Sequence, residues 1–152
     1  MLEQIDHINI VVADIESMIG FYRDALGFRL TKRVTIGGAW VETVVGLPNV
    51  KAEVVYLEAS AGARVELMQY ISPESFRPSC ICEPNAQGIR HLAFRAKDLD
   101  KMVESLQQRG VRFTSEVQQV PDSQVTYAGG VRKRIVYFQD PENNLLELCE
   151  YA

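Results

Sequence analysis

The stretch His7-Ile8-Asn9-Ile10 has a counterpart in His91-Leu92-Ala93-Phe94, and these two segments contain both histidines of the chain. Seven positions after each histidine stands an aspartate followed by an aliphatic residue, at Asp14 and Asp98. An aspartate in that place suits a helix N-cap, because its carboxylate accepts the unpaired N–H groups of the first turn. The pattern therefore predicts a strand followed by a helix, twice along the chain.

The two copies also end alike, with Val65-Glu66-Leu67 matching Leu146-Glu147-Leu148. The separation from histidine to glutamate is 59 residues in the first copy (66−7) and 56 in the second (147−91). Between the copies lies a segment with three prolines, which is typical of a connection. We predict a single domain over 1–152, built from module one at 1–71, a linker at 72–87 and module two at 88–152.

Alternation and helical spacing divide each half into a strand, a helix and three strands. The sequence thus predicts an α+β fold of two tandem βαβββ modules that form curved mixed sheets around a cleft. We also expect a short helix at 39–45 closed by Gly46, and a loop at 121–130 over the ligand of the second half. The expected elements are 4–12, 14–26, 28–36, 51–59 and 63–71, then 88–96, 98–109, 111–119, 133–139 and 144–150.

The alternation of side chains also separates two faces of each predicted sheet. The apolar face is the expected floor for the helices, and the polar face holds four repeat-equivalent residues: His7, Glu66, His91 and Glu147. Two imidazoles and two carboxylates suit one divalent metal ion such as Zn, Ni, Co, Mn or Fe. The alternative is that the histidines are hydrogen-bonded strand residues and the glutamates are solvated, but the equivalent placement of all four favours the metal site.

In these motifs the chain resembles the vicinal oxygen chelate superfamily, the glyoxalase, bleomycin-resistance and extradiol-dioxygenase group. The resemblance covers essentially the whole chain and implies paired βαβββ modules with the metal at His7, Glu66, His91 and Glu147. It rests on residues 6–12, 21–28, 65–67, 88–94 and 137–148.

Within the superfamily, residues 88–94 and 98–113 are most similar to methylmalonyl-CoA epimerases. Glu53 of this chain stands at the position where those enzymes carry a second active-site carboxylate. The resemblance implies a divalent-metal-dependent isomerase or epimerase that acts through an enediolate on a small α-carbonyl substrate such as an acyl-CoA. Glu53 would exchange the proton on one side and Glu147 on the other. An exposed strand position is the alternative for Glu53, because its face depends on the strand register.

Three other functions stay open. A lactoylglutathione-lyase-like enzyme would use the same four ligands, whereas an extradiol-type dioxygenase needs two histidines and one carboxylate, which a fourth ligand at Glu66 disfavours. A metal-free small-molecule-binding protein of the drug-resistance type could stack its ligand on aromatic residues, namely Trp40, Tyr70, Tyr127 and Tyr151. No substrate-binding residue can be assigned from the sequence.

Composition and charge exclude several classes of protein. The chain has 152 residues and a formal net charge of −4, which disfavours binding to a nucleic-acid backbone. No apolar run is long enough to cross a membrane, and the N-terminus does not have the pattern of a secretion signal. We expect a cytoplasmic homodimer that acts on a small molecule.

The remaining reactive or charged residues carry weaker expectations. The odd number of cysteines, Cys80, Cys82 and Cys149, predicts free thiols, and the parity of Cys149 with Glu147 would place it in the cleft, where its oxidation could perturb the site. The basic run at 132–134 could contact a substrate phosphate or carboxylate, although a solvated strand edge is the better interpretation.

Overall fold

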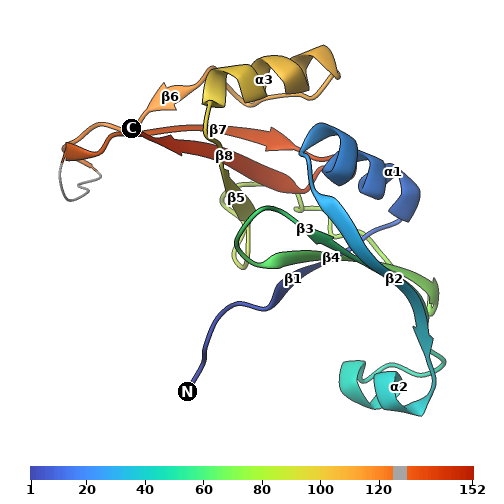
Figure 1. Ribbon diagram of the computed structural model, residues 1–152. Coiled ribbons are helices and arrows are strands. Elements are labelled where there is room, and N and C mark those ends of the chain that lie inside the picture. Colours follow the sequence, from blue (N-terminus) through green and yellow to red (C-terminus); the bar gives the residue numbers. More distant parts are fainter. Residues whose placement is uncertain (125–129) are drawn as a thin grey trace. The chain divides into compact units, whose positions relative to one another are not determined.

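The computed structural model describes residues 1–124 and 130–152, which form two compact units, Met1–Arg77 and Pro78–Ala152. Each unit has one four-stranded mixed sheet and its own helices (Figure 1). The boundary between the units falls within the segment predicted as a linker. None of the helices in the described ranges is long and apolar enough to span a membrane.

The first unit follows the predicted order of strand, helix and three strands, with the extra helix between its second and third strands. Its sheet has the order β1-β4-β3-β2, in which β1 runs parallel to β4 and the other neighbours are antiparallel. The elements are β1 (His7–Val11), α1 (Ile15–Gly20), η1 (Phe21–Ala25), β2 (Arg29–Gly37), α2 (Ala39–Val45), β3 (Lys51–Glu58) and β4 (Arg64–Ser72).

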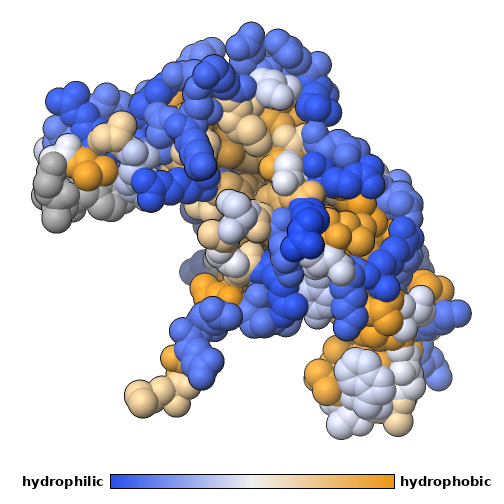
Figure 2. All heavy atoms as spheres, in the orientation of Figure 1, coloured by the Kyte–Doolittle hydropathy of each residue, from blue (hydrophilic) through white to orange (hydrophobic). Residues whose placement is uncertain are grey.

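The second unit repeats this topology, with the sheet order β5-β8-β7-β6 and a parallel β5–β8 pair. Helix α3 lies along one side of β7 and β8 (Figure 1), and its outer surface is mainly hydrophilic (Figure 2). The elements are β5 (His91–Arg95), α3 (Leu99–Gln108), β6 (Gln118–Gln119), β7 (Lys133–Gln139) and β8 (Leu145–Tyr151). The α+β fold of two βαβββ modules is therefore confirmed.

Both predicted N-caps are present. The side chain of Asp14 accepts a hydrogen bond from Ser17 N, and that of Asp98 accepts one from Lys101 N. The first helix is less regular than predicted, because the α-helical part ends at Gly20 and the chain continues to Ala25 as a π-helical turn.

A polar side chain on the last strand of each module also holds the adjacent helix. Gln69 Oε1 on β4 accepts a hydrogen bond from Ile15 N at 2.9 Å, and Glu150 Oε1 on β8 accepts one from Leu99 N at 3.1 Å. Each bond satisfies a helix N-terminal N–H that has no partner within the helix. The helix start is thereby tied to the same register position of the sheet in both units.

The predicted apolar faces form the core of each unit. Val65, Leu67, Leu146 and Leu148 are at most 2% exposed. Complete burial of such a side chain contributes roughly 1.5–3 kcal/mol to folding. These odd-numbered positions of β4 and even-numbered positions of β8 leave the alternate positions, which include Glu66 and Glu147, on the opposite face.

The strand predicted at 111–119 is largely absent, and only Gln118 and Gln119 pair with β7. Phe113 forms an isolated bridge to Phe138, whereas Gln118 pairs with Ile135. The chain therefore advances five residues from 113 to 118 while β7, on the opposing side, advances only three, from 135 to 138. The two extra residues interrupt the hydrogen-bonded ladder between the segments. Of the loop predicted at 121–130, residues 125–129 lie outside the described part of the chain.

Candidate functional site

In the first unit, the parallel pairing of β1 with β4 brings His7 next to Glu66. Asn9 is the register partner of Glu66 and donates from its Nδ2 to Glu66 Oε1 at 2.7 Å. His7 lies two residues earlier on the same face, with its Nε2 3.8 Å from the same oxygen. The His7 side chain is 37% exposed and that of Glu66 only 8%, so a buried carboxylate lies beneath an accessible imidazole.

A neighbouring carboxylate orients the His7 ring. His7 Nδ1 lies 2.7 Å from Asp6 Oδ2, and hydrogen bonds from His7 and Arg64 lower the pKa of Asp6. An ionised carboxylate can only accept, so Nδ1 carries the proton and the neutral ring has its lone pair at Nε2. This is the arrangement typical of a metal-binding histidine, in which the other ring nitrogen donates to a carboxylate.

The second unit has an equivalent pair. His91 Nε2 on β5 lies 3.4 Å from Glu147 Oε2 on β8, with side chains 34% and 5% exposed. The other oxygen of this carboxylate, Oε1, is 3.0 Å from Lys133 Nζ. The contact is not aligned as a hydrogen bond, and the buried Oε1 accepts none from the described residues. Although burial lowers the pKa of Lys133, its attraction to Glu147 raises that pKa overall.

A tyrosine that was not among the residues predicted for the site lies beside each pair. Tyr56 is the register partner of Glu66, and Tyr137 is that of Glu147. Tyr56 meets the His7 ring edge-on at 5.9 Å between centroids, and the Tyr137 ring lies 4.9 Å from the His91 ring. The signal was present in the sequence, since each tyrosine stands ten residues before its glutamate (66−56 and 147−137).

The tyrosines interact with the buried carboxylates. Hydrogen bonding to Glu66, then burial, raises the pKa of Tyr56 to about 12. Burial, followed by the charge of Glu147, raises the pKa of Tyr137. Both hydroxyls therefore stay protonated at neutral pH, so each remains a donor beside a carboxylate.

The donor set of each unit fits part of a metal coordination sphere. Two ligands at about 2.0–2.1 Å from one Zn²⁺ lie roughly 3.4 Å apart across a tetrahedral angle, close to the nitrogen-to-oxygen separations in the two pairs. Each unit supplies one imidazole nitrogen and one carboxylate. Within residues 1–124 and 130–152, no group of three or more such side chains comes together.

Comparison with known proteins identifies the family. Residues 4–148 match the model of the Glyoxalase/Bleomycin resistance protein/Dioxygenase superfamily. The chain belongs to this superfamily. Members of the superfamily often bind a divalent metal. Each of the two histidine–glutamate pairs offers one imidazole nitrogen and one carboxylate oxygen of the kind that such an ion takes as ligands.

Three similar proteins illustrate the relationship. The chain is 31% identical to the uncharacterized protein YaeR of Escherichia coli over 151 residues, 98% of this chain and 97% of the relative. It is 25% identical to the mitochondrial methylmalonyl-CoA epimerase of Mus musculus, over 76% of this chain and 58% of that enzyme. The crystal structure of a glyoxalase family protein from Bacillus cereus has 27% identity and a TM-score of 0.82, and the match covers 99% of this chain and 95% of that one.

Within this superfamily domain, Glu53 lies apart from the pair in its own unit. Glu53 on β3 is the register partner of Gln69, which contacts the N-terminus of α1, so its side chain is on the helix-covered face of the sheet. Arg33 bridges Glu53 and Glu16 there. This ion pair, together with the odd spacing from Tyr56, places Glu53 on the face opposite Glu66.

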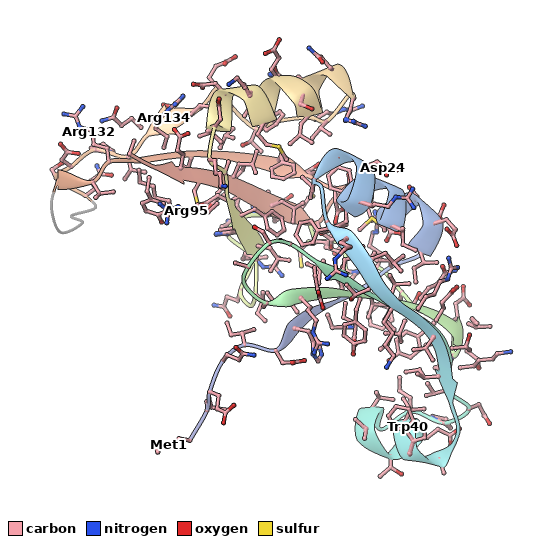
Figure 3. The ribbon with its side chains drawn as sticks, in the orientation of Figure 1. Met1, Asp24, Trp40, Arg95, Arg132 and Arg134 are labelled. Carbon is pink, nitrogen blue, oxygen red and sulfur yellow. The ribbon has the colours of Figure 1, made fainter. Side chains whose placement is uncertain are left out.

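The cysteines and aromatic residues named in the sequence analysis lie in different parts of the two units. Cys80, Cys82 and Cys149 are free thiols, as predicted, and Cys149 is buried with a pKa raised first by burial. Trp40 is exposed on α2, which lies at the far end of β2 (Figures 1 and 3). Tyr70 and Tyr151 lie on the strand positions that alternate with the core, and Tyr127 is outside the described residues.

The predicted basic run at 132–134 divides between the two faces of its sheet. Lys133 contacts Glu147, as described above, whereas Arg134 pairs with Asp100 on α3 and with Glu150. Arg132 N and O bond to Ala152 through the backbone. We expected a solvated strand edge at 132–134, whereas Lys133 and Arg134 are both ion-paired.

Proposed function

We propose that this protein is a divalent-metal-dependent isomerase or epimerase that moves a proton at the carbon beside a carbonyl of a small substrate. His7, Glu66, His91 and Glu147 would together hold the metal, and Glu147 would also exchange the proton. The observation that carries the proposal is the equivalent histidine–glutamate pair on the helix-free face of each sheet. The similarity to a methylmalonyl-CoA epimerase supports the class of reaction.

The chain's own residues have distinct tasks in this proposal. Asp6 keeps the proton on His7 Nδ1, so that Nε2 is free to bind the metal. Asn9 and Tyr56 hold the Glu66 carboxylate in place. When bound, a divalent cation supplies positive charge that stabilises negative charge on a substrate oxygen.

Glu147 is a better candidate than Glu66 for the catalytic base, because its two carboxylate oxygens have different surroundings. Its Oε2 faces His91, whereas its Oε1 lies 3.0 Å from Lys133 Nζ, accepts no aligned hydrogen bond from the described residues, and is the atom that would take the proton. Glu66 Oε1 already accepts from Asn9. We leave Glu53 out of the catalytic set, because it lies on the other face of its sheet in an ion pair with Arg33.

Metal analysis tests the binding part of the proposal. Protein purified without a chelator should contain about one divalent ion per chain, and Glu66→Ala and Glu147→Ala should lose it. Glu53→Ala is the matched control, since it removes a carboxylate from the opposite face and should keep the metal. Folded wild-type protein without metal would contradict the proposal and favour a metal-free small-molecule-binding protein.

Solvent-deuterium uptake tests the chemical part. The metal-loaded protein is incubated in D₂O with methylmalonyl-CoA and, separately, with the methylglyoxal–glutathione adduct, and exchange beside the carbonyl is followed by NMR. We expect exchange with one of them and its loss in Glu147→Gln. Exchange on the glutathione adduct alone would indicate a lactoylglutathione-lyase-like enzyme. Exchange on neither would exclude proton chemistry on these two substrate classes.

A further inference from the structure

The internal repeat allows each position on the helix-free face of one sheet to be compared with its equivalent in the other. Val11 pairs with Met68 in the first unit, and Arg95 pairs with Cys149 in the second. In the same way, Ala52 pairs with Tyr70, and Lys133 with Tyr151. The second unit therefore carries two cations, Arg95 and Lys133, at positions where the first unit has a valine and an alanine.

The fold itself does not require these charges. Ala52 is completely buried in the first unit, so a small apolar side chain satisfies this place in the same β topology. Lys133 is only 19% exposed, and the cost of burying its ammonium group is offset by Glu147, whose Oε1 lies 3.0 Å from Lys133 Nζ. Glu147 balances only one of the two positive charges, and Arg95, which stands where the first unit has a valine, has no carboxylate partner among the described residues. The positive charge of Arg95 is therefore not required by the fold and indicates a function.

Arg95 is the more informative of the two. Its guanidinium lies 5.1 Å from the centroid of the Tyr151 ring, and Lys133 Nζ lies 5.7 Å from it, both within range of a cation–π contact. Arg33, Arg64 and Arg134 each pair with a carboxylate. Arg95 forms no ion pair with any residue in the described part of the chain, and it lies on the side of β8 away from α3 (Figure 3).

We propose that Arg95 and Lys133, held beside Tyr151, bind an anionic oxygen group of the substrate, either a carboxylate or a phosphate. The guanidinium supplies paired N–H donors that match such a group, and Lys133 adds a second positive charge. This inference rests on the proposed function, because it concerns the substrate that reacts at Glu147. The inference restricts the candidate substrates to anions whose charged group would bind beside Tyr151.

The binding of small anions to metal-free protein tests the inference without any need for turnover. Protein treated with EDTA and dialysed is titrated with malonate, with inorganic phosphate and with neutral malonamide, and binding is followed by the ¹H–¹⁵N signals of the arginine side chains and the backbone. We expect the Arg95 Nε–H signal to shift with malonate or phosphate but not with malonamide. The tighter of the two anions identifies a carboxylate or a phosphate as the natural group.

Substitution by the residue of the first unit gives a conservative variant. Arg95→Val should weaken anion binding about tenfold or more, because a hydrogen bond to a charged group is lost. Arg95→Lys should restore part of it. Arg112→Val is the matched control, since it removes one positive charge from an exposed position after α3 and should leave binding unchanged.

The outcomes separate this inference from the proposed function. Equal anion affinity in wild type and Arg95→Val, or malonamide binding as tight as malonate binding, would overturn the inference even if the metal is present. The absence of metal from protein that still binds anions through Arg95 would contradict the proposed function alone. Lys133→Met tests the second cation and should also weaken binding, and correct folding is checked from the dispersion of the same spectra.

Discussion

Tyr56 lies directly across the β3–β4 ladder from Glu66, and hydrogen bonding to that carboxylate raises the pKa of the tyrosine to about 12. Tyr137 has the same register relationship to Glu147 in the second unit. Buried carboxylates are costly unless polar partners surround them. The tyrosine opposite each glutamate is therefore part of the architecture of both histidine–glutamate pairs.

The tyrosine hydroxyls should support metal binding. Tyr56→Phe and Tyr137→Phe each remove a donor beside a ligand carboxylate, and the loss of such a partner typically lowers metal affinity about 10- to 100-fold. Competition with a chromophoric chelator measures the change. Tyr70→Phe, four residues beyond Glu66 on β4, should keep wild-type affinity. Unchanged affinity in both tyrosine variants would show that the hydroxyls do not orient the carboxylates.

The ionisation of Tyr56 should depend on Glu66. Since its folded pKa is raised from 10.0 to about 12, the unfolded chain loses this proton first as the pH rises. The contribution of Tyr56 to stability is therefore complete below pH 10 and is lost as the pH rises toward 12. Ultraviolet titration of the tyrosinate should show one late-ionising tyrosine fewer in Glu66→Gln. An identical titration curve would contradict the coupling.

The Asp6 carboxylate should tune His7 as a ligand. Asp6→Asn weakens the acceptor that keeps the proton on Nδ1, and we expect metal affinity to fall roughly tenfold. Asp24→Asn is the control, because Asp24 is also an exposed aspartate paired with an arginine, Arg23 at 2.6 Å. ¹⁵N spectra of the imidazoles report the tautomer directly. The same His7 tautomer in the wild type and in Asp6→Asn would argue against this role.

The bond from Gln69 to the start of α1 should contribute to stability. Gln69→Leu leaves Ile15 N without its part-buried acceptor, and the loss should lower the free energy of unfolding by about 1–3 kcal/mol. Urea denaturation measures the change. Gln108→Leu alters an exposed glutamine at the end of α3 and should have an effect within about 0.5 kcal/mol. Equal stability of the two variants would show that the bond is dispensable.

Cys149 should react slowly with thiol reagents. The thiol is buried, and burial raises its pKa, so the reactive thiolate is scarce at pH 8. Iodoacetamide labelling followed by mass spectrometry should modify the exposed Cys80 well before Cys149. This placement disfavours our sequence-based hypothesis of a readily oxidised Cys149, and preferential labelling of Cys149 would restore it.

Local patterns were sufficient to predict most elements. Asp14 and Asp98 mark helix starts because N-capping depends only on the next few residues, and alternation marks the apolar face because successive strand side chains point in opposite directions. The prediction was wrong at 111–119, where a five-against-three irregularity breaks the ladder. Irregular pairing depends on the opposing strand, which is distant in the sequence.

The sequence by itself determined the duplication and the two histidine–glutamate pairs, since both rest on repeated spacings and on period-two alternation. Only the tertiary structure showed that Tyr56 faces Glu66, that Glu53 belongs to the helix side, and that Lys133 and Arg95 flank Tyr151. The physical reason is strand register: a shift of one residue exchanges the two faces of a strand, and register is decided by contacts between strands rather than within them.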